Sequence, residues 1–370
     1  MNTVAQAKAP QEVSFETYAD MNQSVSKLIN QGRIRLDDKS VAIFENYGKP
    51  EAATYIVGST AINRSEAVRE LGTNINNADW LRYIAARLVL SLGAGNHKVD
   101  LSLIATSDSI ALLTGDQWSN EPTEQTLTKL QEHISAIYFA TEYTTDQPKK
   151  CSVELSSLKI ISELDAVTAI IPSEIRKAIL VQCGHGDTQM TLVQNGDNGG
   201  IYKRQNGLIA PFNTIGQILK DDHGISKNDL MRGWNTNLVE IDSIGTNKML
   251  NIEELKHARI KTHYEQTLGA LVQDLGDEVD AINGVIVSGG AVNDPIVLKV
   301  ITDYFARQNK KVFTIDSICN AVYPNPLNSG LTNSTSAVFG ALSMMPKNNE
   351  VQLAMDAGNG WSKSALRIFS

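Results

Sequence analysis

The sequence predicts an α/β protein built from two lobes. Strand-like and helix-like segments alternate in both halves of the chain, which favours the α/β class. The length of 370 residues exceeds one average domain, and the apolar fraction of 42% is enough to fill two buried cores. A charged fraction of 20% argues against general disorder.

The charge balance excludes some partners. The net charge is −8, from 33 Lys plus Arg and 41 Asp plus Glu, with no long basic run. Such a chain is poorly suited to bind nucleic acid directly, so any function that involves DNA would need a basic adaptor protein between the two. The longest apolar stretch is interrupted by Arg87, so we expect no membrane span. Three widely spaced cysteines favour a reducing, cytoplasmic location.

The first half begins with small polar residues. We expect an unstructured tail over residues 1–11 and then strands at 12–19 and 53–62, where apolar and polar residues alternate. Apolar residues recur at four-residue steps from Trp80 to Leu92, behind an Asn/Asp start and before a glycine stop. This spacing predicts a helix that faces the core.

The next elements follow the same alternation. A buried strand is predicted from Val99, and a helix around 124–141. In the second half, KAILVQCGHGDTQMTLV is typical of a strand, a tight loop and a second strand. Residues 251–275 carry the pattern of a long amphipathic helix.

The remaining segments complete the second half. The polar stretch 213–252 has little apolar periodicity and is interpreted as a small inserted subdomain. NGVIVSGGAVND is interpreted as a buried strand that runs into a Gly-Gly turn. STSAVFGALSMM is a short apolar helix, and a polar linker connects it to the last twenty residues.

Three glycine turns stand out: DAGNGWSK (356–363), QCGHGDTQ (182–189) and SGGA (288–291). A single glycine turn is most often only a turn. The first two are each followed by short β-like residues without helical periodicity, so both are predicted to be the tips of β-hairpins. Neither has the glycine spacing of a P-loop or a dinucleotide-binding turn, in which a helix follows the glycines.

Hairpin tips of this kind can bind phosphate. Glycines let backbone N–H groups approach an anion without Cβ interference, and a neighbouring carboxylate can hold the hydrated Mg²⁺ that accompanies a nucleotide. Asp356 and Lys363 are the candidates for the carboxylate and for a cation that neutralises phosphate. The alternatives are a turn Asp that caps its own backbone and a solvated Lys at a strand end.

The pattern resembles the nucleotide site of the actin superfamily, which also includes sugar kinases and heat-shock chaperone ATPases. LAMDAGNGWSK resembles its phosphate-1 motif, ILVQCGHGDTQMT its phosphate-2 motif and GVIVSGGA its adenosine motif. LKIISELDAV and LTNSTSAVFGALSMM resemble the two connecting segments. Within the superfamily, the chain is most similar to bacterial and archaeal actin-like proteins of the plasmid-segregating ParM group. The resemblance covers nearly the whole chain, and phosphate-1 is its most specific piece.

The resemblance implies an actin-like two-lobed fold, with ribonuclease-H-like sheets flanked by helices. The first lobe would comprise 12–160 and 334–370, and the second 161–333 with the insert at 213–252. Phosphate-1 starts the chain in the family but follows the terminal helix here, which implies a circular permutation. The linker 346–350 is long enough to permit it, since five residues span about 17 Å at about 3.4 Å per residue.

The resemblance also implies roles for residues of the phosphate-1 motif and for Glu163, at the start of the second lobe. Asp356 would hold Mg²⁺ through a bound water, and Lys363 would reach phosphate. Glu163 would orient the hydrolytic water, although an ordinary exposed Glu is the alternative. Backbone N–H groups would contact the β- and γ-phosphates at Gly358, Asn359 and Gly360.

In the second lobe, Gln182 stands where the family usually has Asp. It supplies no negative charge, so we expect slow hydrolysis, because losing one positioned electrostatic group often costs about 10²–10³ in rate. Asp187 would compensate in part, and the alternative is a structural Asp at the hairpin tip. The phosphate nest would be formed by Gly184, His185 and Gly186, the approach to adenosine or α-phosphate by Ser288, Gly289 and Gly290, and the same cleft would be lined by Asn206 and Gly207.

The function implied is a nucleotide-dependent, filament-forming cytoskeletal ATPase that binds ATP or ADP with Mg²⁺, with GTP as the alternative nucleotide. It would self-associate and serve plasmid or DNA segregation through an adaptor. Two alternatives stay open. A small-molecule kinase would need an Asp base, for which no convincing motif is present. A nucleotide-binding scaffold that neither polymerises nor hydrolyses is supported by Gln182.

Overall fold

The computed structural model describes residues 6–14, 17–19, 36–49, 52–58, 74–141, 148–199, 203–241, 248–322, 331–347, 351–357 and 361–368. These residues fall into two compact units. Unit 1 takes the described residues within 1–169, 325–331 and 337–370, and unit 2 those within 170–324 and 332–336. The sequence placed the lobe junctions at 160/161 and 333/334. Helix α6 (Glu163–Thr168) belongs to unit 1, in which it packs closely against α12 (Ser336–Met344).

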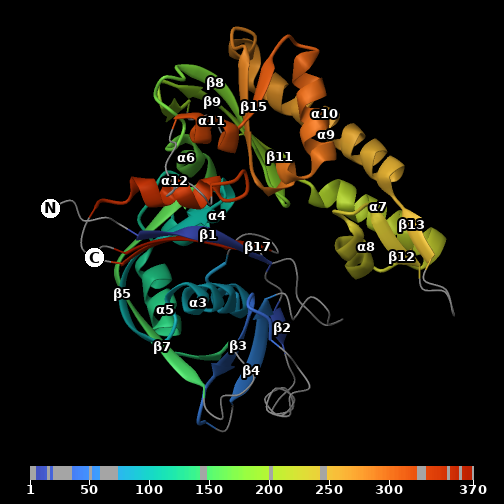
Figure 1. Cartoon of the computed structure of the whole chain (residues 1–370). Coiled ribbons are helices and arrows are strands. Elements are labelled where there is room, and N and C mark those ends of the chain that lie inside the picture. Colours follow the sequence, from blue (N-terminus) through green and yellow to red (C-terminus); the bar gives the residue numbers. More distant parts are fainter. Residues whose placement is uncertain are drawn as a thin grey trace. The chain divides into compact units, whose positions relative to one another are not determined.

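Unit 1 contains a nine-stranded mixed sheet flanked by helices (Figure 1). In spatial order, its strands are β1 (Gln6–Ser14), β17 (Trp361–Ile368), β16 (Val351–Ala357), β5 (Gly95–Ala105), β7 (Lys149–Ser162), β6 (Ile137–Ala140), β3 (Ser40–Glu45), β4 (Ala53–Gly58) and β2 (Thr17–Ala19). Its other helices are α3 (Ala78–Leu92), α4 (Ser107–Thr114) and α5 (Glu124–Ile134). No described helix is both long and apolar enough to cross a membrane.

Strands from the two ends of the chain are paired in this sheet. β1, blue in Figure 1, runs antiparallel beside β17, shown in red, and Gln6 is the direct partner of Ile368. The expectation of an unstructured tail was therefore wrong for residues 6–11. Pro10 lies at the register shift of this edge strand, where a missing N–H is tolerated. The sequence did not reveal residues 6–11 as part of the strand, because these small polar residues pair with a partner more than 300 positions away.

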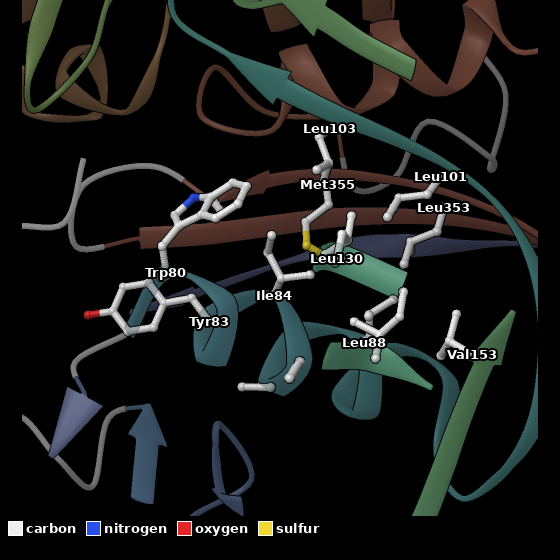
Figure 2. Close-up of a cluster of buried hydrophobic side chains, with 14 of the residues drawn as sticks. Trp80, Tyr83, Ile84, Leu88, Leu101, Leu103, Leu130, Val153, Leu353 and Met355 are labelled. Carbon is white, nitrogen blue, oxygen red and sulfur yellow. The ribbon is translucent and has the colours of Figure 1, made fainter. Parts of the chain in front are cut away.

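The core of unit 1 confirms the helix expected from the four-residue spacing. Asn77 caps α3 by accepting a hydrogen bond from the Asp79 N–H, and Gly93 ends the helix with a positive φ. The helix directs Trp80, Ile84 and Leu88 against one face of the sheet (Figure 2). That face presents Leu101 and Leu103 of β5 and Leu353 and Met355 of β16. The C-terminal strands are thus central to the core.

Unit 2 contains a six-stranded sheet and a separate two-stranded sheet. The larger sheet has β8 (Lys177–Cys183), β9 (Asp187–Gln194), β10 (Asp197–Asn198), β11 (Lys203–Asn206), β14 (Gly284–Ser288) and β15 (Lys311–Thr314), and the smaller one β12 (Leu238–Ile241) and β13 (Lys248–Asn251). The helices are α7 (Ile209–His223), α8 (Lys227–Gly233), α9 (Glu253–Leu275), α10 (Pro295–Ala306) and α11 (Ile315–Val322), with 3-10 turns η1 (Gly276–Val279) and η2 (Gly290–Asn293).

The stretch 213–252 contains more regular structure than its polar composition indicated. It includes most of α7, all of α8 and the β12–β13 hairpin. Trp234 and Val239 are buried in the unit 2 core, and the Trp234 ring lies 5.2 Å from that of Phe212. This segment is therefore packed onto unit 2 through its own apolar residues.

The two larger sheets share one strand pattern. In unit 2, β9 pairs antiparallel with β8 on one side and with β10 and β11 on the other. Beyond β8 come β14 and β15, which run parallel to it. In unit 1, β17 lies antiparallel between β1 and β16, and β16 is followed by the parallel strands β5 and β7. The hairpins β8–β9 and β16–β17 thus occupy equivalent places in their sheets.

Candidate functional site

Both glycine loops predicted to be hairpin tips do join antiparallel strands, β8 to β9 and β16 to β17. Beside the second loop, Asp356 and Lys363 are direct cross-strand partners. The Lys363 Nζ lies 3.2 Å from the Asp356 Oδ2, and both side chains are largely buried. The predicted contacts of Gly358, Asn359 and Gly360 fall on residues outside those the structure describes.

Glu163 and Asp356 belong to the same edge of the unit 1 sheet, although almost 200 residues separate them in sequence. β16, β5 and β7 are parallel; Asp356 pairs with Ile104, and the next residue of β5 pairs with Ser162. Glu163 follows immediately as the first residue of α6, whose N-terminus is capped by the Ser162 hydroxyl. Neighbouring strands lie about 4.8 Å apart, and β5 lies between β16 and β7. The backbones of Asp356 and Ser162 are therefore about 10 Å apart at the carboxyl edge. Ligands of open α/β sheets bind at such edges.

Strand alternation fixes the direction of the Asp356 side chain. Leu353 and Met355 face α3, so Asp356, one residue further along the strand, faces the opposite side of the sheet. It is 9% exposed, at the end of a strand that lies between two others. The fold therefore holds this carboxylate in a defined position.

The carboxyl edge of the unit 2 sheet joins two more sequence-predicted sites. β8 and β14 are parallel, and Gln182 pairs directly with Ser288. Gln182 is 2% exposed. The turn that follows Ser288 confirms the expected strand and Gly-Gly turn, and η2 and α10 come after it. The phosphate-2 and adenosine candidates are thus neighbours in one unit.

The loop after β8 is clamped by the residues that lead into α7. The N–H groups of Gly207 and Ile209 donate to the carbonyls of Gly186 and His185, at 3.1 and 2.7 Å. The Gly184 N–H donates to the carbonyl of Asp187 at 2.7 Å, so it is engaged within the loop. This clamp places Asn206 and Gly207 beside the loop, where Asn206 pairs with Asp187.

Helix α9 contacts the residues that lead into α7. The Nε2 of His263 on α9 lies 2.9 Å from the Asn206 carbonyl oxygen. Burial lowers the pKa of His263, which favours the neutral ring near pH 7. Because the partner is a carbonyl, Nε2 must carry the proton and donate it.

The glycines of this edge separate into two groups. A Cβ at Gly207 would lie 2.5 Å from the Gly184 oxygen, and one at Gly289, whose φ is +97°, 2.2 Å from the Cys183 oxygen. Close packing therefore accounts for these two. At Gly290 the nearest atom to a Cβ would be the Ser334 Cβ, at 3.9 Å. Packing leaves room for a side chain there, so close packing does not account for this glycine.

Sequence reasoning missed two residues that hold the Gly-Gly turn. The Asn333 carbonyl accepts from the Gly289 N–H at 2.8 Å, and the hydroxyls of Ser288 and Ser336 lie 2.6 Å apart. Hydroxyl residues just before an apolar helix are a helix-start signal, so the run from Thr332 to Ser336 was recognisable as a cap. Its contact with Ser288 was not, because 48 positions separate the two serines.

The residues fit a magnesium ion that arrives with a nucleotide. Among the described residues, no group of three or more His, Cys, Asp or Glu side chains is suited to hold a metal alone. Magnesium bound to phosphates keeps several waters and needs only one or two protein carboxylates. Asp356 and Lys363 provide the types of group that such an ion and its phosphates require.

Comparison with known proteins identifies the fold. No protein-family model and no curated protein matches the chain. Among solved structures, the actin-like protein Alp7A matches with a TM-score of 0.57 at 10% identity, covering 88% of both chains. A non-polymerisable quadruple mutant of pCBH ParM matches with a TM-score of 0.59 at 11% identity, covering 88% of this chain and 90% of that one.

A third match is ParM of Bacillus thuringiensis, solved with ATP. Its TM-score is 0.51 at 12% identity, covering 87% of this chain and 88% of that one. At such low identity, a structural likeness establishes the fold alone. From the two helix-flanked sheets and these matches, we conclude that the chain has the actin-like fold.

Proposed function

We propose that the protein is an actin-like ATPase that binds ATP with Mg²⁺ and assembles into filaments when nucleotide is bound. The observation that carries this proposal is the placement of Asp356 and Glu163 at one carboxyl edge of unit 1, with Lys363 paired to Asp356. The similar structures add support, since they include ParM with ATP, ParM with ADP and a ParM variant described as non-polymerisable.

Each residue has a role in this proposal. Asp356 would hold Mg²⁺ through water, Lys363 would exchange its carboxylate partner for phosphate, and Glu163 would orient the attacking water. Bound Mg²⁺ would neutralise phosphate charge. The loop residues His185, Gly186, Gly358, Asn359 and Gly360 would donate backbone N–H groups to phosphate. Gly184, whose own N–H is bonded to the Asp187 carbonyl, would shape the second loop, with Asp187 beside it. The turn of Ser288, Gly289 and Gly290 would approach adenosine, near Asn206 and Gly207.

The proposed partners follow from charge and fold. With a net charge of −8, the filament would reach DNA through a basic adaptor protein, and plasmid or DNA segregation in the cytoplasm is the cargo function we propose. A nucleotide-binding scaffold with little hydrolysis is the second candidate. It is favoured by Gln182, a buried amide where the phosphate-2 motif usually carries an acid.

Light scattering and phosphate release, measured in one reaction, test the proposal. After ATP and Mg²⁺ are added, we expect scattering by the wild-type protein to rise above a critical concentration, with slow phosphate release. Glu163→Gln should still polymerise but release phosphate at least about tenfold more slowly, since positioned water-activating groups contribute about 10²–10⁴ in rate. A flat scattering trace up to tens of micromolar would contradict filament formation. Equal phosphate release would remove Glu163 from the site.

We also propose that the chain order is circularly permuted. In unit 2 the equivalent strands follow the chain as β8, β9, β11, β14 and β15. Unit 1 has the same order only when β16 and β17 are placed ahead of β1, β5 and β7. Because Gln6 lies opposite Ile368, a short turn would join β17 to β1.

A reordered chain tests this proposal. Residues 346–370 are moved ahead of residue 1, so that β16 and β17 precede β1. We expect the reordered protein to fold with the same circular dichroism spectrum and a thermal midpoint within a few degrees of the wild type, since every strand pair is kept. The same residues moved in scrambled order serve as the control and should not fold. Failure of the correctly reordered chain to fold would contradict the proposal.

A further inference from the structure

Unit 2 contains a buried lysine that the proposed nucleotide chemistry does not use. Lys256 lies on α9 and is 2% exposed. Its Nζ lies 2.6 Å from the Asp294 Oδ2 and donates to the Trp234 carbonyl at 2.8 Å and the Asn237 Oδ1 at 3.0 Å. Two of the three ammonium donors are thus hydrogen-bonded, and the contact with Asp294 is a buried ion pair. The Nζ also lies 4.5 Å from the centre of the Trp234 ring.

The partners of Lys256 come from two separate parts of unit 2. Asp294 follows η2, which begins at Gly290, and its other carboxylate oxygen caps α10 by accepting from the Ile296 N–H at 3.0 Å. The Asp294 N–H donates to the Ala291 carbonyl at 3.1 Å. Asp294 therefore fixes the end of the turn that begins at Gly290.

The other partners lie between α8 and the β12–β13 hairpin. Trp234 follows α8, and Asn237 has the left-handed φ of 57° that turns the chain into β12. The Asn237 carbonyl also accepts from the Ile252 N–H at 2.9 Å, just before α9. A buried charge held between these elements joins the hairpin base to the Gly-Gly turn.

We propose that Lys256 is a positioning residue for nucleotide binding, which couples the Gly289–Gly290 turn to residues 234–241. Lys256 holds the turn through Asp294, and it holds the hairpin base through Trp234 and Asn237. A nucleotide that orders the turn then also orders the hairpin base, and the reverse holds, because coupling between two sites is reciprocal. This inference rests on the proposed function, since it assumes that the Gly290 turn contacts nucleotide.

A second buried lysine offers a matched comparison. Lys310 is 5% exposed, and its Nζ donates to the carbonyls of Val279 and Ile282 at 2.7 and 2.8 Å. It precedes β15, at the end of β14 away from Ser288, because Gly284 pairs with Lys311. Four residues of β14, about 13 Å, separate that end from the turn. Lys310→Met therefore removes a similar buried amine without touching the turn.

The test compares Lys256→Met/Asp294→Asn with Lys310→Met. A single substitution would leave a buried charge without its partner and destabilise the protein strongly, whereas the paired substitution removes both charges. The Asn side chain at position 294 keeps an oxygen that can cap α10. Lys256→Gln/Asp294→Asn, which also leaves no unpaired buried charge, is a further variant should the pair fail to fold. Binding of a fluorescent ATP analogue with Mg²⁺ gives the affinity, and amide hydrogen exchange of 234–241 with and without nucleotide gives the coupling.

In wild type and Lys310→Met, nucleotide is expected to slow exchange in 234–241, with affinities within about twofold of each other. In Lys256→Met/Asp294→Asn, affinity should fall about tenfold, within the usual range of coupling between sites, and the protection should disappear. Two outcomes would overturn this inference and leave the proposed function standing. One is wild-type affinity with retained protection in the double variant, and the other is an equal loss of affinity and protection in Lys310→Met. No nucleotide binding by the wild type would overturn the proposed function and the inference with it.

Discussion

Gly340→Ala is expected to destabilise unit 1 by about 3 kcal/mol or more, and Gly340→Val to prevent its folding. A Cβ at Gly340 would lie 1.6 Å from the Ala166 oxygen and 2.4 Å from its carbonyl carbon. The obstacle is backbone of α6, so the atoms can separate only if α6 and α12 move apart. Extra atoms in a packed core typically cost about 1–3 kcal/mol, and backbone contacts this short belong at the upper end or beyond.

Urea unfolding measures this effect, and Gly269→Ala is its control. Gly269 lies in the middle of α9, and the nearest atom to its Cβ would be the Tyr304 hydroxyl at 3.8 Å. Alanine there should be neutral or stabilise by up to about 1 kcal/mol, because glycine is unfavourable inside a helix. Equal unfolding midpoints for Gly340→Ala and the wild type would show that α6 and α12 do not approach so closely.

Asp356→Ala is expected to abolish Mg²⁺-dependent nucleotide binding. The variant removes the carboxylate assigned to the metal and leaves Lys363, whose Nζ is 3.2 Å away, without this partner. Isothermal titration with ATP, with and without Mg²⁺, measures the loss. We expect no detectable heat from the variant at concentrations that saturate the wild type.

The matched control is Asp100→Ala. Asp100 is a carboxylate of similar burial, 6% exposed against 9% for Asp356, and accepts from the Ser157 hydroxyl at 2.8 Å. It pairs with Gln352 on β16 and so lies on the Asp356 face, four residues or about 13 Å along the strands. Asp100→Ala should lower stability and leave nucleotide binding intact. Normal binding by Asp356→Ala, or its loss in both variants, would refute the metal assignment.

The sequence predicted part of the site because the relevant signals are local. The hairpin form of both glycine loops followed from the β-like residues behind them, and the pairing of Asp356 with Lys363 is a consequence of that hairpin. The meeting of Glu163 with Asp356 at one edge depends on the order of β16, β5 and β7, which no local pattern encodes.

Elements whose signal lies within a few residues were predictable from the amino-acid sequence. Helix α3 follows from the spacing of Trp80, Ile84 and Leu88, and the α/β class from the alternation of segments. Three other features were visible in the folded protein alone: residues 6–11 form a strand beside β17, Lys256 meets Asp294, and Asn333 holds Gly289. The physical reason is the same in each case. These groups make their contacts with partners tens to hundreds of residues away, so the residues next to them in sequence do not predict the contact.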